Sequence, residues 1–175
     1  MISLFPSPPV DFYSQAVPVI GESHGRIHDG EMFFYTDAVT LGVGVSQDYL
    51  ITVGAKNAHF RYSANGILVT SFLIYENGDR VGTTLQTVNN MNRQSAITPL
   101  TTIRKGTSGG TTDGTLISTY SSGGAAVISA QGSSAGLDEE YILKTGTKYI
   151  LRITSGTAAN LCNLRVNFYE HTPGT

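Results

Sequence analysis

The sequence predicts an all-β protein, an antiparallel sandwich or barrel that is preceded by an N-terminal arm. Apolar residues recur at every second position through the C-terminal third, which is the period of a strand with one buried face. No window of a dozen residues keeps a helical period, and Asn-Gly pairs separate short β-rich runs. Many short strands without helices are typical of an antiparallel sandwich or barrel.

Residues 1–29 differ from the rest of the chain. Pro6, Pro8, Pro9 and Pro18 fix the backbone and remove amide donors, so neither a long helix nor a central strand fits there. We therefore expect an extended arm over residues 1–29 and a β-sandwich domain over residues 30–175. The arm is too apolar for a free tail, and the side chains expected to contact another surface are Phe5, Val10, Phe12, Tyr13, Val17 and Ile20.

From Gly30 onward the chain reads as a series of short strands. Asn65-Gly66 and Asn77-Gly78 lie between β-rich runs and predict type I′ hairpin turns, because that turn needs a positive φ at both central residues. The segment from Gly106 to Gly136 is rich in Gly, Ser and Thr, and we interpret it as long loops flanking two strands. The strands expected before the C-terminal third are 32–35, 48–53, 59–63, 67–76, 83–88, 97–103, 115–120 and 125–130.

The C-terminal third carries the clearest strand pattern. Two β-type runs flank a tight Thr145-Gly146 turn, and a third run covers residues 162–171. In the third run Phe168 falls on the predicted core face with Leu164 and Val166, and the alternating positions are polar. The run that follows the turn alternates in the same way over residues 148–154, with Ile150 as the exception.

Composition narrows the function. The 175 residues suffice for one domain with an arm, and only 14% of them are charged, against about 25% in a typical soluble domain. Polarity comes instead from 21 Thr, 16 Ser and 20 Gly, which suit sheets, turns and a surface that other chains partly cover. A net charge of −2 gives no electrostatic case for nucleic acid, and no run approaches a membrane span. Cys162 is the single cysteine, so an intrachain disulfide is excluded, and we expect no signal peptide.

No catalytic or metal-binding set emerges from the motifs. Ser134 sits in a G-x-S-x-G match, but no helix is expected after it, and Ser108 lies in a glycine-rich turn without a preceding Asp. We interpret both serines as loop residues and expect neither enzymatic activity, nor a cofactor, nor a bound metal. Potential metal ligands also gather in the segment 22–31. A helix would be needed to bring its two histidines onto one face, and the glycines of the segment argue against a helix, so we interpret it as a solvated hinge. The potential ligands are Glu22, His24, His28, Asp29 and Glu31.

The C-terminal sequence "ILKTGTKYILRITSG … LRVNFYEH" resembles the closing strands of small jelly-roll proteins that decorate the heads of tailed bacteriophages. The resemblance covers residues 30–171 and is distinctive only in the C-terminal part. It implies a jelly-roll β-sandwich that binds the outside of an icosahedral head and cements capsomers. The expected partners are then the major capsid protein and further copies of the chain, with a homotrimer favoured over a dimer. The expected location is the capsid exterior, after synthesis in the host cytoplasm.

Two other classes of function remain open. A glycan-binding module of a phage fibre or secreted protein would need a concave polar patch with exposed aromatics, for which Tyr62, Tyr75 and Tyr169 are the candidates. A hydrolase would need one of the four histidines to meet Ser134 or Ser108 in space.

Overall fold

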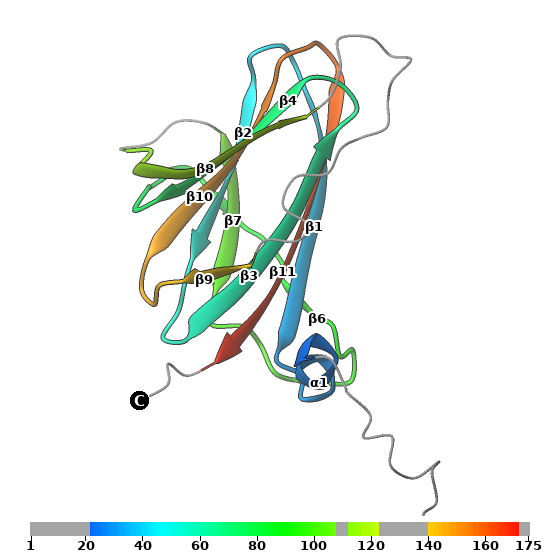
Figure 1. The fold of residues 1–175 in the computed structure, drawn as a ribbon, viewed down its shortest axis with the longest axis vertical. Helices are drawn as coiled ribbons and strands as arrows, with labels where there is room; N and C mark the ends of the chain where they lie inside the picture. The colour runs from blue at the N-terminus through cyan, green and yellow to red at the C-terminus, as the bar shows by residue number, and fades with distance from the viewer. Residues whose placement is uncertain (1–21, 108–111, 123–139, 172–175) are drawn as a thin grey trace, which may run out of the picture.

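The computed structural model describes residues 22–107, 112–122 and 140–171. Two antiparallel sheets pack face to face, which confirms the predicted all-β sandwich (Figure 1). The five-stranded sheet has the order β6-β1-β11-β3-β9, and the six-stranded sheet has the order β5-β7-β2-β10-β4-β8. The elements are α1 (Glu22–His28), β1 (Met32–Leu41), β2 (Ser46–Thr52), β3 (Asn57–Gly66), β4 (Thr70–Glu76), β5 (Thr84–Leu85), β6 (Asn89–Asn90), β7 (Thr102–Thr107), β8 (Thr115–Ser122), β9 (Tyr141–Leu143), β10 (Lys148–Ser155) and β11 (Asn160–His171).

The strand pairing is that of a jelly roll. The first half of the chain pairs with the second half in reverse order: β1 with β11, β2 with β10, β3 with β9 and β4 with β8. Pairing of β11 with β3 and of β10 with β4 then completes the two sheets. This long, rolled hairpin is the arrangement that gives the double-sheet jelly roll its eight strands.

The core lies between the two sheets and is built on alternating positions. Phe33, Phe168 and Phe60 are neighbours on β1, β11 and β3, and all three are almost fully buried. From the opposite sheet they face a second buried set, which includes Tyr49, Ile51, Phe72, Ile74, Leu151 and Ile153. The predicted face of β11 is therefore confirmed. The sulfur of Cys162 is also buried here, and burial raises the pKa of its thiol.

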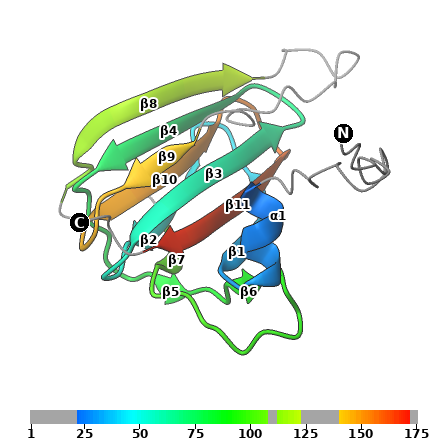
Figure 2. The same cartoon turned by 60° about the horizontal axis from the view of Figure 1, so that its bottom comes forward.

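The connection between β4 and β8 covers one side of the sandwich. Within it, β6 pairs with β1 and forms the edge of that sheet, β7 pairs with β2, and β5 pairs with β7 (Figure 2). Its first residues cross the outer face of the six-stranded sheet, where a Cβ on Gly78 would lie 2.3 Å from the Cδ1 of Ile150. This cover explains why Ile150 breaks the alternation of β10, since it is buried on the outer face instead of in the core.

Both predicted Asn-Gly hairpins are wrong. Asn65 and Gly66 belong to β3 and pair with Asn163 and Cys162 of β11, and the chain then crosses to the other sheet. Gly66 has no positive φ; it is needed because a Cβ would lie 1.9 Å from the Oγ1 of Thr70. Asn77 does adopt a positive φ of 62°, but it directs the chain across the sheet instead of back along β4. The Thr145-Gly146 turn is confirmed, with Gly146 at φ 66°, and it joins strands of different sheets.

Several predicted strands have different lengths. β1 continues to Leu41 because all ten of its residues pair with β11. Only two-residue strands form within 83–90, and the predicted strand 97–103 begins at Thr102, because Glu170 holds the backbone N–H groups of Leu100 and Thr101 outside the sheet. The predicted strand 125–130 lies outside the described residues.

A helix forms where we expected an extended hinge. In α1 the N–H of Gly30 donates to the carbonyl of Ile27, and the N–H of Glu31 donates to that of Arg26. With Gly30 at φ 73°, these two hydrogen bonds form a Schellman cap. Gly30 therefore terminates a helix, whereas the sequence analysis takes the glycines of this segment as evidence against one. The rest of the predicted arm, residues 1–21, lies outside the described residues, and the domain boundary at residue 30 stays a prediction.

Candidate functional site

The predicted contact residues of the arm all lie outside the described residues: Phe5, Val10, Phe12, Tyr13, Val17 and Ile20. Ser108 and Ser134 lie outside them as well. The arm contacts and the roles of both serines therefore stay predictions. The described residues nevertheless contain four clusters and surfaces whose chemistry can be judged.

The first cluster joins three strands of the five-stranded sheet around His59. Its Nδ1 lies 2.6 Å from the Oε1 of Glu140 and 2.8 Å from the hydroxyl of Tyr169, and its Nε2 lies 2.7 Å from the Nε2 of His171. Burial raises the pKa of Glu140, but the hydrogen bonds from His59 and Arg61 outweigh it and lower that pKa overall. The cluster ties the start of β9 to β3 and β11.

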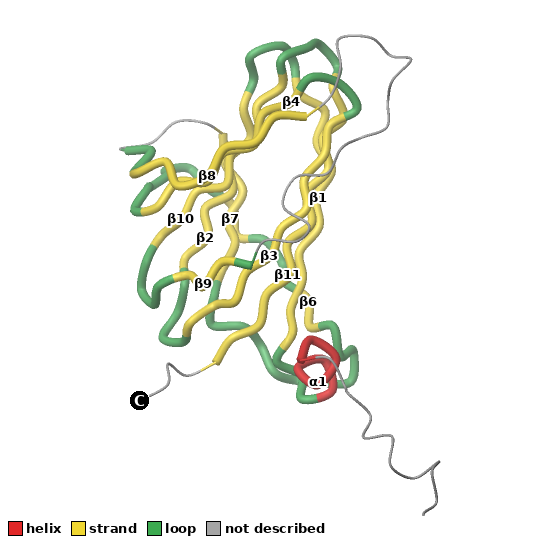
Figure 3. The backbone as a smooth tube through the Cα atoms, viewed as in Figure 1, coloured by secondary structure: helices red, strands yellow, loops and turns green. Residues whose placement is uncertain are grey.

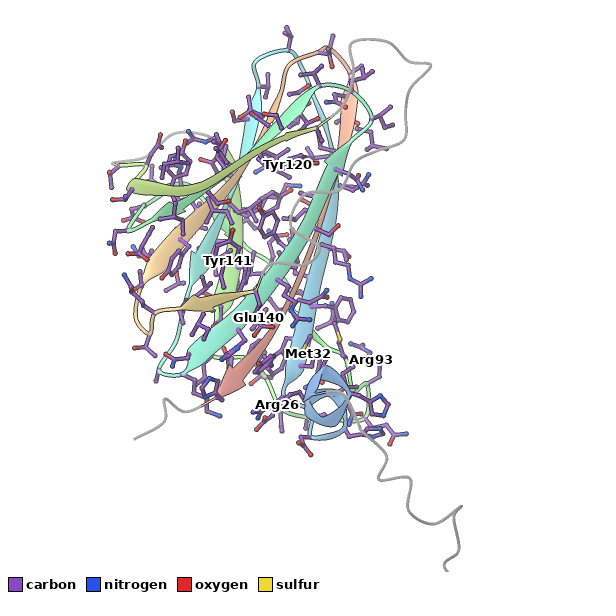
Figure 4. The ribbon with its side chains drawn as sticks, in the orientation of Figure 1. Arg26, Met32, Arg93, Tyr120, Glu140 and Tyr141 are labelled. Atoms are coloured by element: carbon purple, nitrogen blue, oxygen red, sulfur yellow. The ribbon has the colours of Figure 1, made fainter. Side chains whose placement is uncertain are left out.

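The two other histidines lie on α1. Because α1 is helical, His24 and His28 share a face, with ring centroids 4.6 Å apart and Nε2 atoms 2.9 Å apart. On the same helix Arg26 lies over the ring of Tyr169, 5.2 Å from its centroid, and donates to Glu31. No three metal-ligating side chains converge anywhere in residues 22–107, 112–122 and 140–171. Figure 4 labels Arg26 beside Met32, at the end of the sandwich that α1 covers.

The second cluster is a buried ion network on the outer face of the six-stranded sheet. Asp48 is fully buried and accepts hydrogen bonds from Arg80 and from the Nε and Nη2 of Arg152, at 2.8 and 3.0 Å. Arg80 and Arg152 also donate to Asp113, and the hydrogen bond from Arg152 lowers the pKa of Asp113. Arg80 completes its pairing with the carbonyls of Asp79 and Thr112, each at 2.8 Å. The network fastens both ends of the β4–β8 connection to β2 and β10.

The third feature is the end of the sandwich formed by the loops 42–45, 67–69 and 156–159, at the top of Figure 3. Backbone hydrogen bonds join the loops, from Gly44 N to Ser155 O at 2.7 Å and from Gly156 N to Val69 O at 2.8 Å. Asn160, fully buried, donates from its amide to the carbonyl of Val69 and accepts from the N–H of Leu68. The three loops therefore form one fixed surface, which we call the tip.

The tip is apolar and carries no charge. Its large exposed side chains are branched aliphatics on the loops 42–45 and 67–69 and at the start of β11, and the loop 156–159 adds only small residues. None of the three loops contains a Lys, Arg, Asp, Glu or aromatic residue. The most exposed is Val43, at 67%. Apolar patches of a few hundred Å² on a soluble domain often mark contact sites. The members are Val43, Val45, Ile67, Val69 and Leu161.

The sequence analysis did not identify the tip. Residues 67–69 were assigned to a strand, where aliphatic side chains need no further explanation, and the three loops are far apart in the sequence. The available signal was the run Gly42-Val43-Gly44-Val45, which combines flexible residues with apolar ones and has no polar side chain.

The last feature is an open depression on the outer face of the five-stranded sheet. It has a volume of ≈ 530 Å³ and is lined mainly by polar residues, among them Ser63, Asn65, Asn163 and Arg165. None of the described residues that line it is aromatic. Of the tyrosines proposed as a glycan platform, Tyr62 and Tyr169 are buried, and Tyr75 is half-buried beside Arg152.

No family model matches the chain, and no curated protein matches it. No helix in the described part of the chain combines the length and apolar character needed to span a bilayer.

Proposed function

We propose that this chain is a structural virion protein that binds the outer surface of a phage head and stabilises the contacts between capsid subunits. The major capsid protein is its main partner, the capsid exterior is its location, and it acts without catalysis. Further copies of the chain are the second partner, with a trimer favoured by the resemblance and a dimer possible.

The observation that carries the proposal is the tip. A clamp on a protein shell needs a rigid body and a surface that other proteins can cover. The tip offers aliphatic side chains on loops that are held together by Asn160 and by backbone hydrogen bonds, so little conformational entropy is lost on docking. The lack of basic and aromatic residues in its loops makes it unlike surfaces that bind lipid headgroups.

The jelly roll supports the same proposal. The segment that resembles head-decoration proteins forms β9, β10 and β11, and β10 and β11 are the strands that complete the two sheets. The residues that carry the resemblance therefore belong to the framework of the sandwich, and the fold that the resemblance implies is compatible with the one the chain adopts.

Co-sedimentation with heads that lack this protein tests the proposal. The purified full chain is expected to pellet with the heads, and Val43→Glu is expected to weaken that binding at least tenfold, because it places a charge at the centre of the tip. Val81→Glu is the matched control, since Val81 is 65% exposed and lies on the β4–β8 connection. If the wild-type chain stays in the supernatant, the proposed function is wrong. If it pellets and both variants pellet equally well, the tip is not the contact surface.

A glycan-binding module of a fibre or secreted protein is the second candidate. The polar depression beside Asn163 favours it, whereas the described part of the lining offers no aromatic side chain, which counts against it. Titration calorimetry with a panel of bacterial surface glycans separates the two, because binding that is lost in Asn163→Ala would support the glycan module.

A further inference from the structure

The six-stranded sheet ends in an edge strand of unusual character. β8 pairs with β4 on one side, and within the described residues no strand pairs with its other side. It forms the upper edge of the sandwich in Figure 2. Six of its eight residues are exposed, and the exposed apolar side chains are Leu116, Ile117 and Tyr120.

The other three sheet edges combine very short strands with charged neighbours, and β8 does not. The edge strands β5 and β6 have two residues each and β9 has three, and very short strands offer few free backbone groups to another chain. These strands leave parts of β7, β1 and β3 unpaired among the described residues, but each of those three strands carries charge, at Arg104 and Lys105, at Asp37 and at Arg61. β8 has eight residues and contains no charge and no proline. A bulge at Ile117 interrupts its register, but the pairing is regular from Ser118 to Ser122. This edge therefore lacks the charges and short length that normally block strand addition.

We propose that β8 is a self-association edge, which pairs antiparallel with β8 of a second copy of this chain. An uncharged strand meets its own copy without like-charge repulsion, and two copies are necessarily equal in length. All of the strand pairs in both sheets are antiparallel, so a β8–β8 pair continues the six-stranded sheet without a change of pattern. A twofold contact of this kind is the commonest symmetry of soluble oligomers.

The inference concerns the dimer and does not depend on head binding. It favours the dimer that sequence analysis left open beside the trimer, because an edge that pairs with itself closes after two copies. Tyr120 would lie close to the dimer axis, and its ring stacks on that of Phe72 with the centroids 6.3 Å apart. Figure 4 labels Tyr120 together with Tyr141, which belongs to the opposite sheet. The hydroxyl of Tyr141 donates a hydrogen bond to Ser118 of β8. A single strand buries less than the roughly 800 Å² per partner of a standard interface, so we expect a dissociation constant in the micromolar range.

Sedimentation velocity of the full chain tests the inference. The wild-type chain is expected to shift from 18.6 kDa to twice that mass as its concentration rises to about 100 µM. Thr119→Lys is expected to raise the dissociation constant at least tenfold, because lysine on an edge strand opposes pairing. Thr84→Lys is the matched control, since Thr84 is also exposed and lies on β5 at the other edge of the same sheet, and it should dimerise like the wild type.

A second variant and a second readout keep the test decisive. Ser121→Lys should act like Thr119→Lys, so that misfolding of one variant does not decide the result. In hydrogen exchange the amides of residues 118–122 should gain protection in the wild-type chain as it dimerises. A chain that stays monomeric at about 100 µM, forms a trimer, or dimerises equally well with a lysine in β8 would overturn the inference. Binding of an unrelated extended peptide to β8 without dimerisation would overturn it as well.

Discussion

The buried ion network predicts a large loss of stability when Asp48 loses its charge. The side chain of Asp48 has no solvent exposure, and that of Arg80, its partner, is 1% exposed. Asp48→Asn keeps the volume of the side chain but removes the buried carboxylate, so the buried Arg80 keeps only Asp113, which is 48% exposed, as an ionic partner. Removing one partner of such a pair typically costs about 3–5 kcal/mol, because the remaining ion cannot regain its hydration.

The position of the network sharpens this expectation. Arg152 also contacts Asp48, and both arginines keep Asp113 as a second partner. Arg152 is 14% exposed whereas Arg80 is 1% exposed, so the loss falls mainly on Arg80. Arg80 fixes the β4–β8 connection through the carbonyls of Asp79 and Thr112. The amides of that connection should therefore exchange faster in Asp48→Asn than those of the core strands.

Urea denaturation of the wild type and of two variants measures the effect. Asp48→Asn should lower the free energy of unfolding by about 3–5 kcal/mol with an unchanged denaturant slope. Asp113→Asn, in the same network but 48% exposed, should cost less than about 1 kcal/mol. If the two variants lose equal stability, or if Asp48→Asn loses less than about 1 kcal/mol, solvent reaches Asp48 and the buried network is wrong.

Three further predictions follow from the core, the carboxylates and the arm. Phe168→Ala should cost about 3–5 kcal/mol, because Phe168 is fully buried between Phe33 and Phe60, whereas Asn167→Ala should cost little; the reverse order in thermal melts would mean that the face of β11 is misassigned. Hydrogen bonds from lysine and histidine partners lower the pKa values of Glu76 and Glu140 below 4.5, so the stability they provide is complete above pH 4.5 and is lost as the pH falls through the lowered values; a urea midpoint that stays constant on acidification would contradict this. Deletion of residues 1–21, which keeps α1, should leave the β-type circular dichroism intact and weaken binding to heads; failure to fold would place the arm in the core.

Local patterning was sufficient to predict the fold class and the faces of the C-terminal strands. From Cys162 to Phe168 each core residue of β11 alternates with a polar one, so Phe168 could be placed without coordinates. The same reasoning failed for Asn65-Gly66, because the sequence signal for a turn depends on the backbone conformation, whereas Gly66 is retained for its close approach to Thr70. The prediction that the segment before Gly30 is not helical was also wrong, since a glycine can cap the end of a helix as well as interrupt one.

The candidate surfaces could not be predicted because they depend on which segments become neighbours. The tip combines Val43 and Ile67 with Leu161, which follows Val43 by more than a hundred residues, and only the closing of the roll brings the three together. Likewise, β8 could be recognised as a strand, but its position at an unprotected edge depends on the order of the six-stranded sheet. Asp48 also appeared as an ordinary strand residue until Arg80 and Arg152 were found beside it.

Electron microscopy of phage heads before and after addition of the purified chain is the most direct test of the proposed function. Heads that lack the protein should gain density at regular positions on the outer surface of the shell, with a jelly roll fitting that density and its tip directed toward the capsid protein. The decorated heads should also withstand heating that disrupts bare heads. Heads that gain no external density at saturating protein, and that melt at the same temperature with and without it, would contradict the account.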